Sequence, residues 1–251
     1  MAQQRLDKII ASTGRYSRRE VKTLVREGRV LVDGRIAASA EDKCDPLTAR
    51  ISVNGEELFY REHTYVMLHK PAGVLSATED GRGETVLDLL APEYRKIGLF
   101  PVGRLDKDTE GLLLLTDDGA LAHDLLAPKK HVDKVYFVRT DGALDDADCK
   151  AFEQGITLGD GLECLPAKLE ILKSDAQSEA LITIREGKFH QIKRMLASRG
   201  KPVVYLKRLS MGSLTLDERL SKGEYRLLTA EEIKNLRGSG QFAQGKAGAD
   251  K

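Results

Sequence analysis

The longest compact apolar run in the chain is Leu112–Leu115, four leucines in succession. A short run without polar alternation is typical of a strand that is covered on both faces. A membrane-spanning helix needs about 18 apolar residues, and no segment of the chain approaches that length. We therefore expect a protein built around a buried sheet, with no membrane-spanning segment.

Composition supports a folded protein of one or two domains. Of the 251 residues, 41% are hydrophobic and 31% are charged, which is more apolar material than a disordered chain carries. The domain count follows from a typical size of about 150 residues per domain. The N-terminus carries no apolar stretch of signal-peptide length, so we expect a cytoplasmic protein.

Cysteine and histidine usage argues against a metal or a cofactor. The three cysteines, Cys44, Cys149 and Cys164, are far apart and form no C-x-x-C pair of the kind that zinc sites use. The five histidines form no H-E-x-x-H pattern, and no G-x-x-x-x-G-K-[ST] phosphate loop is present. We expect a protein that uses no metal and no cofactor.

Charge is balanced overall and uneven along the chain. The net charge is +1, yet residues 1–39 contain nine basic and four acidic side chains, and residues 185–208 contain eight basic and one acidic. Residues 141–179 hold ten acidic side chains against three lysines. Two basic segments and one acidic segment are typical of a protein that binds a polyanion on one side. Solvated helix faces would give the same composition, so charge alone leaves both interpretations open.

The first forty residues predict two short helices and a hairpin. Ser17, followed three residues later by Glu20, is the capping-box pattern that begins a helix. Gly28 is suited to end that helix in a left-handed conformation. The dipeptide Asp33-Gly34 between two apolar segments predicts a tight hairpin turn.

The second predicted helix carries a row of cations at spacings of four, four and three residues, which suits contact with a phosphate backbone. This N-terminal region resembles the S4 RNA-binding domain through the string RLDKIIASTGRYSRREVKTLVREGRVLVDGRIA, and the resemblance covers roughly residues 5–50. It implies that structured RNA binds to the second helix and the loop before it. The residues concerned are Arg15, Arg18, Arg19, Lys22, Arg26 and Arg29.

A charged loop precedes the leucine run. Gly103 and Gly111 bracket this loop, which contains Arg104, Asp106 and Asp108. A charged loop closed by glycines against a buried strand is a good place to hold a reactive carboxylate. The residues themselves do not distinguish Asp106 from Asp108.

Two further segments carry candidate residues. Lys134–Val138 is typical of a strand that has Tyr136 on one face. Downstream, helical spacing of apolar residues predicts a basic helix over 190–199, with Lys193 and Arg194 in its first turn. The earlier segment Lys70-Pro-Ala-Gly73 is interpreted as a structural turn.

Together these segments resemble one family closely. The motifs are G-R-L-D-x-x-T-x-G-L-L-L-L-T-x-D-G, K-x-Y-x-V, E-G-x-x-H-Q-[IV]-K-R-M and G-E-Y-R-x-L-T, and the resemblance spans residues 5–235. The family is that of the pseudouridine synthases that act on ribosomal RNA and carry an N-terminal S4 domain. The stretches LFPVGRLDKDTEGLLLLTDDG and PKKHVDKVYFV are most similar to its members that act on small-subunit (16S) ribosomal RNA.

The resemblance implies a site that isomerises uridine to pseudouridine without a cofactor. Asp106 matches the family's carboxylate, which acts at the sugar as a nucleophile or a base. Lys193 matches the basic residue that compensates this carboxylate, and the adjacent Arg194 could substitute for it. Tyr136 matches the tyrosine that stacks on the target base.

Two more residues are expected to contact RNA. Arg104 resembles the arginine that fills the gap left by a flipped nucleotide. His190 precedes the basic helix and could serve as a helix cap or as an RNA contact.

Two alternative functions remain open. The protein could catalyse the same reaction on large-subunit (23S) ribosomal RNA, or it could be a non-catalytic RNA-binding assembly factor.

The expected fold class is α+β, and the family resemblance implies a catalytic domain built on a mixed, largely antiparallel sheet. We expect strands near 64–68, 112–115, 134–139 and 180–185, and helices near 119–127 and 190–199. The expected domains are an S4-like RNA-binding domain over 1–59, a catalytic domain over 60–236 and a flexible tail over 237–251. We expect a monomer whose partner is ribosomal RNA within a small-subunit assembly intermediate.

Overall fold

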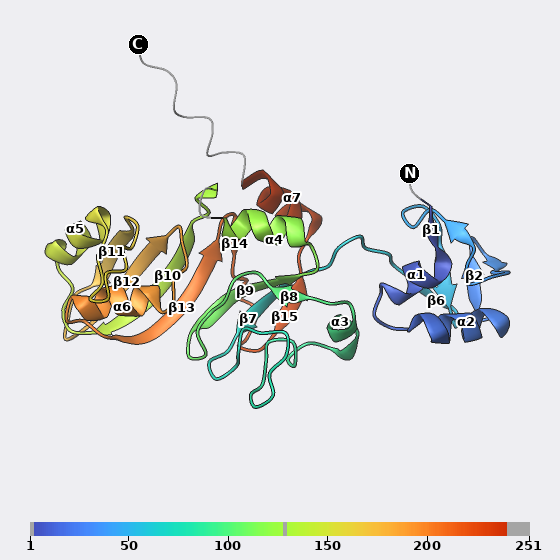
Figure 1. Cartoon of the computed structure of the whole chain (residues 1–251), viewed down its shortest axis with the longest axis horizontal. Helices are drawn as coiled ribbons and strands as arrows, with labels where there is room; N and C mark the ends of the chain where they lie inside the picture. Colours follow the sequence, from blue (N-terminus) through green and yellow to red (C-terminus); the bar gives the residue numbers. More distant parts are fainter. Residues whose placement is uncertain (1–2, 128–129, 240–251) are drawn as a thin grey trace, which may run out of the picture. The chain divides into compact units, whose positions relative to one another are not determined.

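The computed structural model of the protein describes residues 3–127 and 130–239 (Figure 1). The chain forms two compact units. The first contains Met1–Thr64 together with Leu90–Leu99, and the second contains Tyr65–Leu89 and Phe100–Lys251. The domain boundary expected at residues 59 and 60 lies a few residues before Tyr65, where a central strand begins.

The first unit is built from short helices and short strands around one small core of leucine, isoleucine, valine and alanine. Its helices are α1 (Leu6–Ala11), α2 (Arg18–Arg26) and α3 (Pro92–Lys96). Strands β2 (Val30–Val32), β3 (Arg35–Ile36), β5 (Ile51–Val53) and β6 (Glu56–Leu58) form an antiparallel sheet in the order β3-β2-β5-β6. Strands β1 (Gln4–Arg5) and β4 (Lys43–Cys44) pair separately.

Local signals in the sequence account for these boundaries. The capping box of α2 is present, because Ser17 Oγ accepts from the Glu20 amide at 3.2 Å and the Glu20 carboxylate accepts from the Ser17 amide at 2.6 Å. In the hairpin between β2 and β3, Asp33 and Gly34 have φ values of 51° and 78°, as a type I′ turn requires. The helix pair and hairpin predicted for this region are therefore confirmed.

The second unit is built on one nine-stranded sheet in the order β11-β12-β10-β13-β9-β7-β15, with β14 paired to β13 and β8 paired to β9. The strands are β7 (Tyr65–Lys70), β8 (Phe100–Pro101), β9 (Glu110–Thr116), β10 (Lys134–Asp141), β11 (Lys168–Lys173), β12 (Gln177–Ile184), β13 (Val203–Met211), β14 (Leu214–Thr215) and β15 (Tyr225–Leu227). Only the β9–β13 pairing is parallel among the strands described in residues 3–127 and 130–239. The expected α+β class with a mixed, largely antiparallel sheet is confirmed.

Strand β9 lies inside this sheet, between β7 and β13, and all seven of its residues are buried. The leucine run is therefore covered on both faces, as its uniform apolarity predicts. Gly111 makes the parallel pairing possible: a Cβ there would lie 2.2 Å from the carbonyl oxygen of Arg208, and its φ of +105° excludes most other residues.

Four helices accompany the sheet. They are α4 (Gly119–Leu126), α5 (Asp146–Gln154), α6 (Gln191–Ser198) and α7 (Ala230–Ser239). Helix α4 and helix α7 share a core with one face of β7 and β9 and lie together along one edge of the view in Figure 1. Helix α6 packs on β13 and leaves a cleft between itself and the loop before β9.

The chain's last described residues belong to α7. The flexible tail was expected to begin at residue 237, but Arg237 donates hydrogen bonds to Tyr65 Oη at 2.7 Å and to Asp118 Oδ2 at 3.2 Å, and α7 extends to Ser239. The rest of the expected tail, 240–251, lies outside the described residues. Within 3–127 and 130–239, no helix combines the length and the apolar character that crossing a membrane requires.

Candidate active site

A cleft in the second unit brings together five of the six site residues expected in that unit. Its walls come from the loop before β9, from β10, and from the loop that leads into α6 together with the first turn of that helix. The five residues are Arg104, Asp106, Tyr136, His190 and Lys193. They come from positions up to 89 residues apart in the sequence, so only the folded sheet makes them neighbours.

Asp106 and Lys193 form an ion pair at the centre of the cleft. The Lys193 ammonium lies 3.0 Å from Asp106 Oδ2, and His190 Nε2 lies 3.6 Å from Asp106 Oδ1. Burial lowers the pKa of Lys193, but its hydrogen bonds to Asp108 and Asp106 outweigh that effect and raise the pKa above its ordinary value. The lysine therefore stays positively charged at neutral pH and supplies a counter-ion to the carboxylate.

The structure distinguishes the two carboxylates that the sequence left open. The side chain of Asp106 is 26% exposed and lines the cleft, whereas that of Asp108 is 74% exposed. Asp108 reaches Lys193 from the other side, at 2.5 Å, and this hydrogen bond lowers the pKa of Asp108. Asp108 thus helps to hold the lysine, while Asp106 faces the space that a substrate would occupy.

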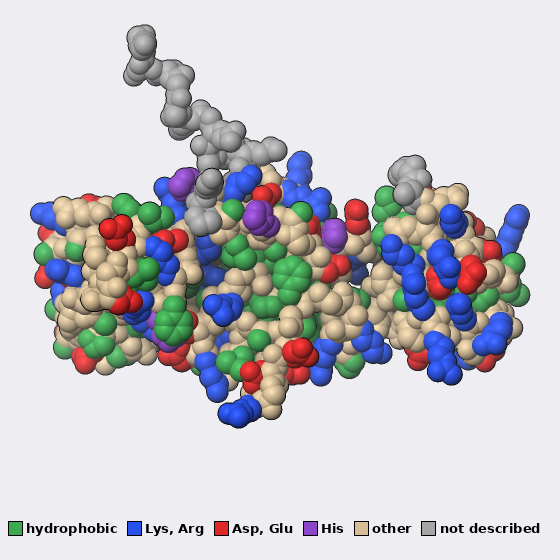
Figure 2. Space-filling model, in the orientation of Figure 1, with side chains coloured by type: hydrophobic (Ala, Val, Ile, Leu, Met, Phe, Trp, Pro, Cys, Tyr) green, Lys and Arg blue, Asp and Glu red, His purple; other side chains and the backbone are tan. Residues whose placement is uncertain are grey.

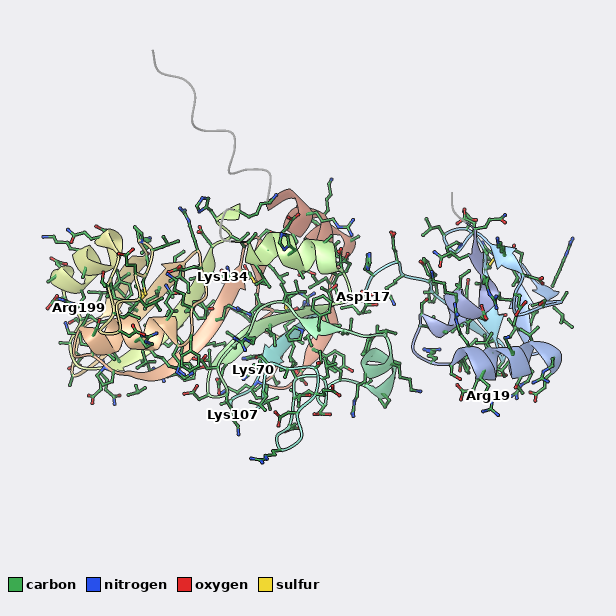
Figure 3. All side chains as sticks on the ribbon, viewed as in Figure 1. Arg19, Lys70, Lys107, Asp117, Lys134 and Arg199 are labelled. Atoms are coloured by element: carbon green, nitrogen blue, oxygen red, sulfur yellow. The ribbon has the colours of Figure 1, made fainter. Side chains whose placement is uncertain are left out.

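A buried lysine holds the loop that carries Asp106. The Lys70 ammonium donates to the carbonyl oxygens of Pro71, Asp106, Lys107 and Thr109 at 2.9–3.2 Å. Its side chain is fully buried, and burial lowers the pKa of Lys70 to about 8. Figure 3 labels Lys70 and Lys107 on neighbouring segments of this region. The turn predicted as structural is therefore also the anchor of the candidate active-site loop.

The Lys70–Gly73 turn and the segment after it complete this support. The amide of Gly73, whose φ is +92°, donates to the carbonyl oxygen of Lys107 at 2.7 Å. Ser76 Oγ donates to the carbonyl oxygen of Leu105 at 2.9 Å and accepts from the Leu105 amide at 3.1 Å. These bonds fix the backbone on either side of Asp106.

Tyr136 and Arg104 differ in depth. Tyr136 lies on β10, is 7% exposed and lines the cleft with its ring. Arg104 is exposed, and within the described part of the chain no hydrogen bond or ion pair is recorded for its guanidinium. A buried ring inside the cleft is suited to stack on a base, and a free cation at the edge of the cleft is suited to contact a phosphate backbone.

His190 is the N-cap residue of α6, but its side chain makes no capping hydrogen bond. Its backbone is left-handed, with φ 50° and ψ 32°. The loop around it is held by Gln191, whose side-chain amide donates to Glu186 Oε1 at 2.7 Å and accepts from the Lys188 amide at 3.0 Å. His190 therefore occupies the helix-cap position, one of its two expected roles, but its side chain takes no part in capping and stays available for the other.

Arg194 lies outside this arrangement. Its guanidinium pairs with Asp160 Oδ2 at 2.6 Å, and it is not among the residues that line the cleft. Successive helical residues point about 100° apart, so the neighbour of Lys193 faces elsewhere. Arg194 therefore does not stand in for Lys193 next to Asp106.

Two buried cations at the cleft were missed by sequence reasoning. Lys134 and Arg208 are 6% and 2% exposed, and both line the cleft beside Tyr136. Burial and the nearby Arg208 lower the pKa of Lys134 to about 8. Arg208 Nε donates to the carbonyl oxygen of Leu112 at 2.7 Å. The sequence alone does not show that a charged side chain is buried. Only the position of these two residues on the inner face of a strand could have indicated their burial.

The two basic segments turn out to differ. Most cations of residues 185–208 pair with carboxylates of the same unit; besides those of Lys193 and Arg194, the pairs are Arg185 with Asp133, Lys188 with Glu186, Arg199 with Asp148, and Lys201 with Asp145 and Asp148. In the first unit, all six expected cations, on α2, the loop before it and the turn after it, are exposed, and Arg15, Lys22 and Arg29 form only exposed ion pairs with Glu56, Glu41 and Glu27. Figure 2 shows basic side chains gathered over this unit. The polyanion-binding prediction therefore rests on the first unit and on the cleft.

The cleft has the parts that chemistry on one nucleotide of an RNA chain requires. A carboxylate with a fixed counter-ion can act as nucleophile or base, an aromatic ring inside the cleft can stack on a base, and exposed cations can hold phosphates. Together with the exposed arginines of the first unit, the fold and the cleft define an RNA-modifying enzyme.

Comparisons with known proteins identify the family. A family model described as RNA pseudouridylate synthase matches residues 64–198, and an S4 domain model matches residues 4–46. An uncharacterized RNA pseudouridine synthase of Bacillus subtilis is 51% identical over 91% of this chain and 96% of its own length. The ribosomal small subunit pseudouridine synthase A of Vibrio cholerae is 40% identical over 92% of this chain and 99% of its own.

A relative with a different target and a solved structure complete the comparison. The ribosomal large subunit pseudouridine synthase B of Bacillus subtilis is 38% identical over 93% of this chain and 96% of its own length. A crystal structure of a pseudouridylate synthase superposes with a TM-score of 0.65 at 36% identity, covering 94% of this chain and 100% of the other. The chain belongs to the RNA pseudouridylate synthase family and carries an N-terminal S4 domain, as its motifs predict.

Proposed function

We propose that this pseudouridine synthase acts on ribosomal RNA, and that its target uridine lies in small-subunit (16S) RNA. The observation that carries the reaction is the Asp106–Lys193 pair inside a cleft that also holds Tyr136. Support for ribosomal RNA comes from relatives that match over nearly the whole chain and are named for that substrate. The small-subunit assignment rests on the stretches around Asp106 and Tyr136, which are most similar to small-subunit members.

In the proposed reaction, the N1–C1′ bond of the target uridine breaks and a C5–C1′ bond forms. The uracil turns within the cleft between the two steps, the proton leaves C5, and N1 gains one, so nothing is oxidised or reduced. Asp106 acts at the sugar or the ring as nucleophile, or at the sugar as base. Each of these routes needs an ionised carboxylate, and Lys193 keeps a positive charge 3.0 Å from it.

The remaining site residues bind the RNA. Tyr136 stacks on the target base, and Arg104 enters the gap that the flipped nucleotide leaves. Flipping costs a few kcal/mol, and inserted side chains offset part of that cost. His190, 3.6 Å from Asp106, contacts the bound nucleotide. The exposed cations of α2 and its approach loop hold structured RNA.

The domain roles and the setting belong to the same proposal. Residues 1–59 serve as the RNA-binding domain and 60–236 as the catalytic domain. The partner is ribosomal RNA within a small-subunit assembly intermediate, and the enzyme works in the cytoplasm as a monomer.

A large-subunit target is the second candidate, because the large-subunit relative is 38% identical while the small-subunit relative from Vibrio cholerae is 40% identical. The two identities differ by two percentage points. The substrate class must therefore be decided by experiment.

The test is release of tritium from RNA labelled at uridine C5, because forming the C5–C1′ bond expels that hydrogen. Small-subunit and large-subunit transcripts and partly assembled particles are offered separately. Release from small-subunit substrate alone is the expected result. Release from large-subunit RNA alone would keep the reaction and refute the target. Absence of release from every substrate, with RNA still bound, would refute the reaction.

A further inference from the structure

An aromatic side chain stands exposed at the entrance of the cleft. Phe189 is 71% exposed, and it lines the cleft together with Asp106 and Arg104. Burying a phenylalanine side chain stabilises a protein, and leaving it in water forgoes that stabilisation. Because the ring lies in the cleft that holds the candidate catalytic carboxylate, a ligand bound in that cleft would cover it.

Phe189 does not stand alone. Its ring lies against the ring of His190, with 3.8 Å between the ring centroids and 19° between the ring planes. His190 is 43% exposed and its Nε2 lies 3.6 Å from Asp106 Oδ1. The two rings therefore form a flat stack beside the candidate catalytic carboxylate, with the outer ring open to solvent.

The backbone beneath the stack is fixed. His190 has a left-handed backbone with φ of 50°, a conformation that is unfavourable for residues other than glycine. Buried Glu186 and Gln191 bond to each other at 2.7 Å on either side of the pair. The fold thus holds the stack in place before any ligand arrives, which lowers the entropy cost of binding.

We propose that Phe189 and His190 form a stacking subsite for the unpaired nucleobase next to the target uridine. Unstacked RNA bases are recognised by aromatic side chains on which they stack. When the target uridine leaves the strand, its neighbour loses a stacking partner, and the exposed Phe189 ring supplies one. This inference rests on the proposed function, because it takes the target to be a uridine that binds at Asp106.

Depth separates this subsite from the one for the target base. Tyr136 is 7% exposed inside the cleft, whereas Phe189 is ten times more exposed at its entrance. A flipped base reaches the inner ring, and a base that remains in the strand meets the outer one. Arg104, exposed on the opposite loop of the cleft, suits a phosphodiester rather than an apolar protein segment.

The chain contains no tryptophan, which allows a direct optical test. In the full-length Phe189→Trp variant, the introduced indole is the sole tryptophan, and stacking on a base quenches its emission. The matched control is Leu172→Trp on β11, which is 52% exposed and is not among the residues that line the cleft. The probe is a single-stranded RNA nonamer with a central uridine between adenines, together with the same RNA carrying abasic sites on both sides of the uridine.

Titration with the intact nonamer is expected to quench the Phe189→Trp emission at least twofold and to leave the Leu172→Trp emission unchanged. The abasic nonamer is expected to remove the quenching. Equal emission changes in the two variants, or quenching that survives the abasic sites, would overturn the proposal.

A kinetic comparison tests the same subsite without an optical probe. Phe189→Leu is expected to lower kcat/KM for tritium release about tenfold or more, mainly through KM, and Phe189→Tyr to restore it. Wild-type kinetics in Phe189→Leu would refute the subsite while leaving the proposed reaction intact. Quenching of Phe189→Trp by RNA without any tritium release from the wild type would refute the reaction and leave the subsite standing.

Discussion

Arg104 and Arg194 are both arginines of the cleft region, but their surroundings assign them different tasks. Arg104 has no partner recorded among the described residues, whereas Arg194 is engaged by Asp160 at 2.6 Å. An arginine without a partner can contact RNA without first breaking an ion pair.

Arg104→Ala is therefore expected to raise KM about tenfold, since one phosphate or stacking contact is worth about 1–3 kcal/mol. Arg194→Ala is expected to leave KM and kcat within about twofold and to lower the free energy of unfolding by less than about 1 kcal/mol. Steady-state tritium-release kinetics and urea unfolding of both variants measure this. A larger kinetic loss in Arg194→Ala than in Arg104→Ala would reverse the assignment.

At this scale, sequence reasoning identified five of the residues that line the cleft. Asp106, Tyr136 and Lys193 were found through motifs that keep their order along the chain, and they line one cleft. The buried cations Lys134 and Arg208 were missed, because charged residues are normally exposed and a single sequence does not record their burial. Arg194 was included only because it follows Lys193, and the helix turns it away.

The candidate active-site loop depends on a hydrogen-bond donor from strand β7. Lys70, the last residue of β7, donates to four backbone carbonyl groups, three of them in the loop. Removing such a buried donor leaves its acceptors unpaired, at a cost of about 1–3 kcal/mol.

Lys70→Met is expected to lower the free energy of unfolding by about that amount and to reduce kcat more than it raises KM, because Asp106 loses its support. The control is Lys107→Met, which removes an exposed lysine from the same loop. Unfolding curves and tritium-release kinetics report the two effects. A Lys70→Met enzyme with wild-type kcat would show that the loop does not need this donor.

Strand β10 begins with a lysine whose charge is costly. Burial lowers the pKa of Lys134 to about 8 in the folded protein, while an unfolded chain keeps a lysine pKa near 10.4. Between pH 8 and 10.4 the unfolded state therefore holds more protons than the folded state, and folding stability gains from rising pH.

The wild type is accordingly expected to gain stability relative to Lys134→Met as the pH rises from 8 towards 10, by an amount on the order of 2–3 kcal/mol. Below pH 8 the difference between the two proteins is expected to be constant. Urea unfolding at intervals of half a pH unit checks this. A difference that does not change between pH 8 and 10 would mean that Lys134 titrates normally.

Element boundaries were predictable where local chemistry determines them. The capping box set the start of α2, and the leucine run located β9. Strand β9 begins at Glu110, two residues earlier than expected, because that carboxylate is buried and paired with Tyr205 and Lys222 at 2.8 and 2.9 Å. The hydrophobic pattern of the sequence does not predict contacts between residues so far apart along the chain.

At the scale of the whole molecule, RNA affinity and chemistry reside in different units. The first unit exposes cations on α2, and Arg18, Arg19 and Arg26 have no carboxylate partner recorded among the described residues. The catalytic cleft lies wholly in the second unit.

Replacing Arg18, Arg19 and Arg26 by glutamine is therefore expected to weaken RNA binding and to reduce the salt dependence of the binding constant by about 2–3 counterions. The kcat at saturating RNA is expected to stay within about twofold. The control makes the same change of charge in the second unit, with glutamine at Lys150, Lys168 and Lys173. Filter binding at several salt concentrations compares the RNA affinities of the two triple variants. Equal losses of affinity in both would mean that α2 has no special role in RNA binding.

The sheet order of the second unit could not be predicted from sequence. Its central feature is the parallel pairing of β9 with β13, whose paired residues are 97 positions apart. Gly111 permits that pairing. A glycine at this point of the motif indicates that another backbone segment approaches closely, but the sequence does not show which segment it is. The α+β class was predictable from the strand and helix patterns and the sheet type from the family resemblance, while the order of strands depends on long-range contacts.

The most direct measurement compares Asp106→Asn with Asp108→Asn. The two side chains are two residues apart and both contact Lys193, at 3.0 and 2.5 Å, but only Asp106 lines the cleft. Tritium release and RNA affinity are measured for both variants on the RNA that the wild type modifies. Asp106→Asn is expected to bind RNA within about threefold of the wild type and to release no tritium above background, while Asp108→Asn keeps at least about a tenth of the wild-type kcat. Tritium release by Asp106→Asn would contradict the account, and so would a loss of tritium release that occurs only in Asp108→Asn.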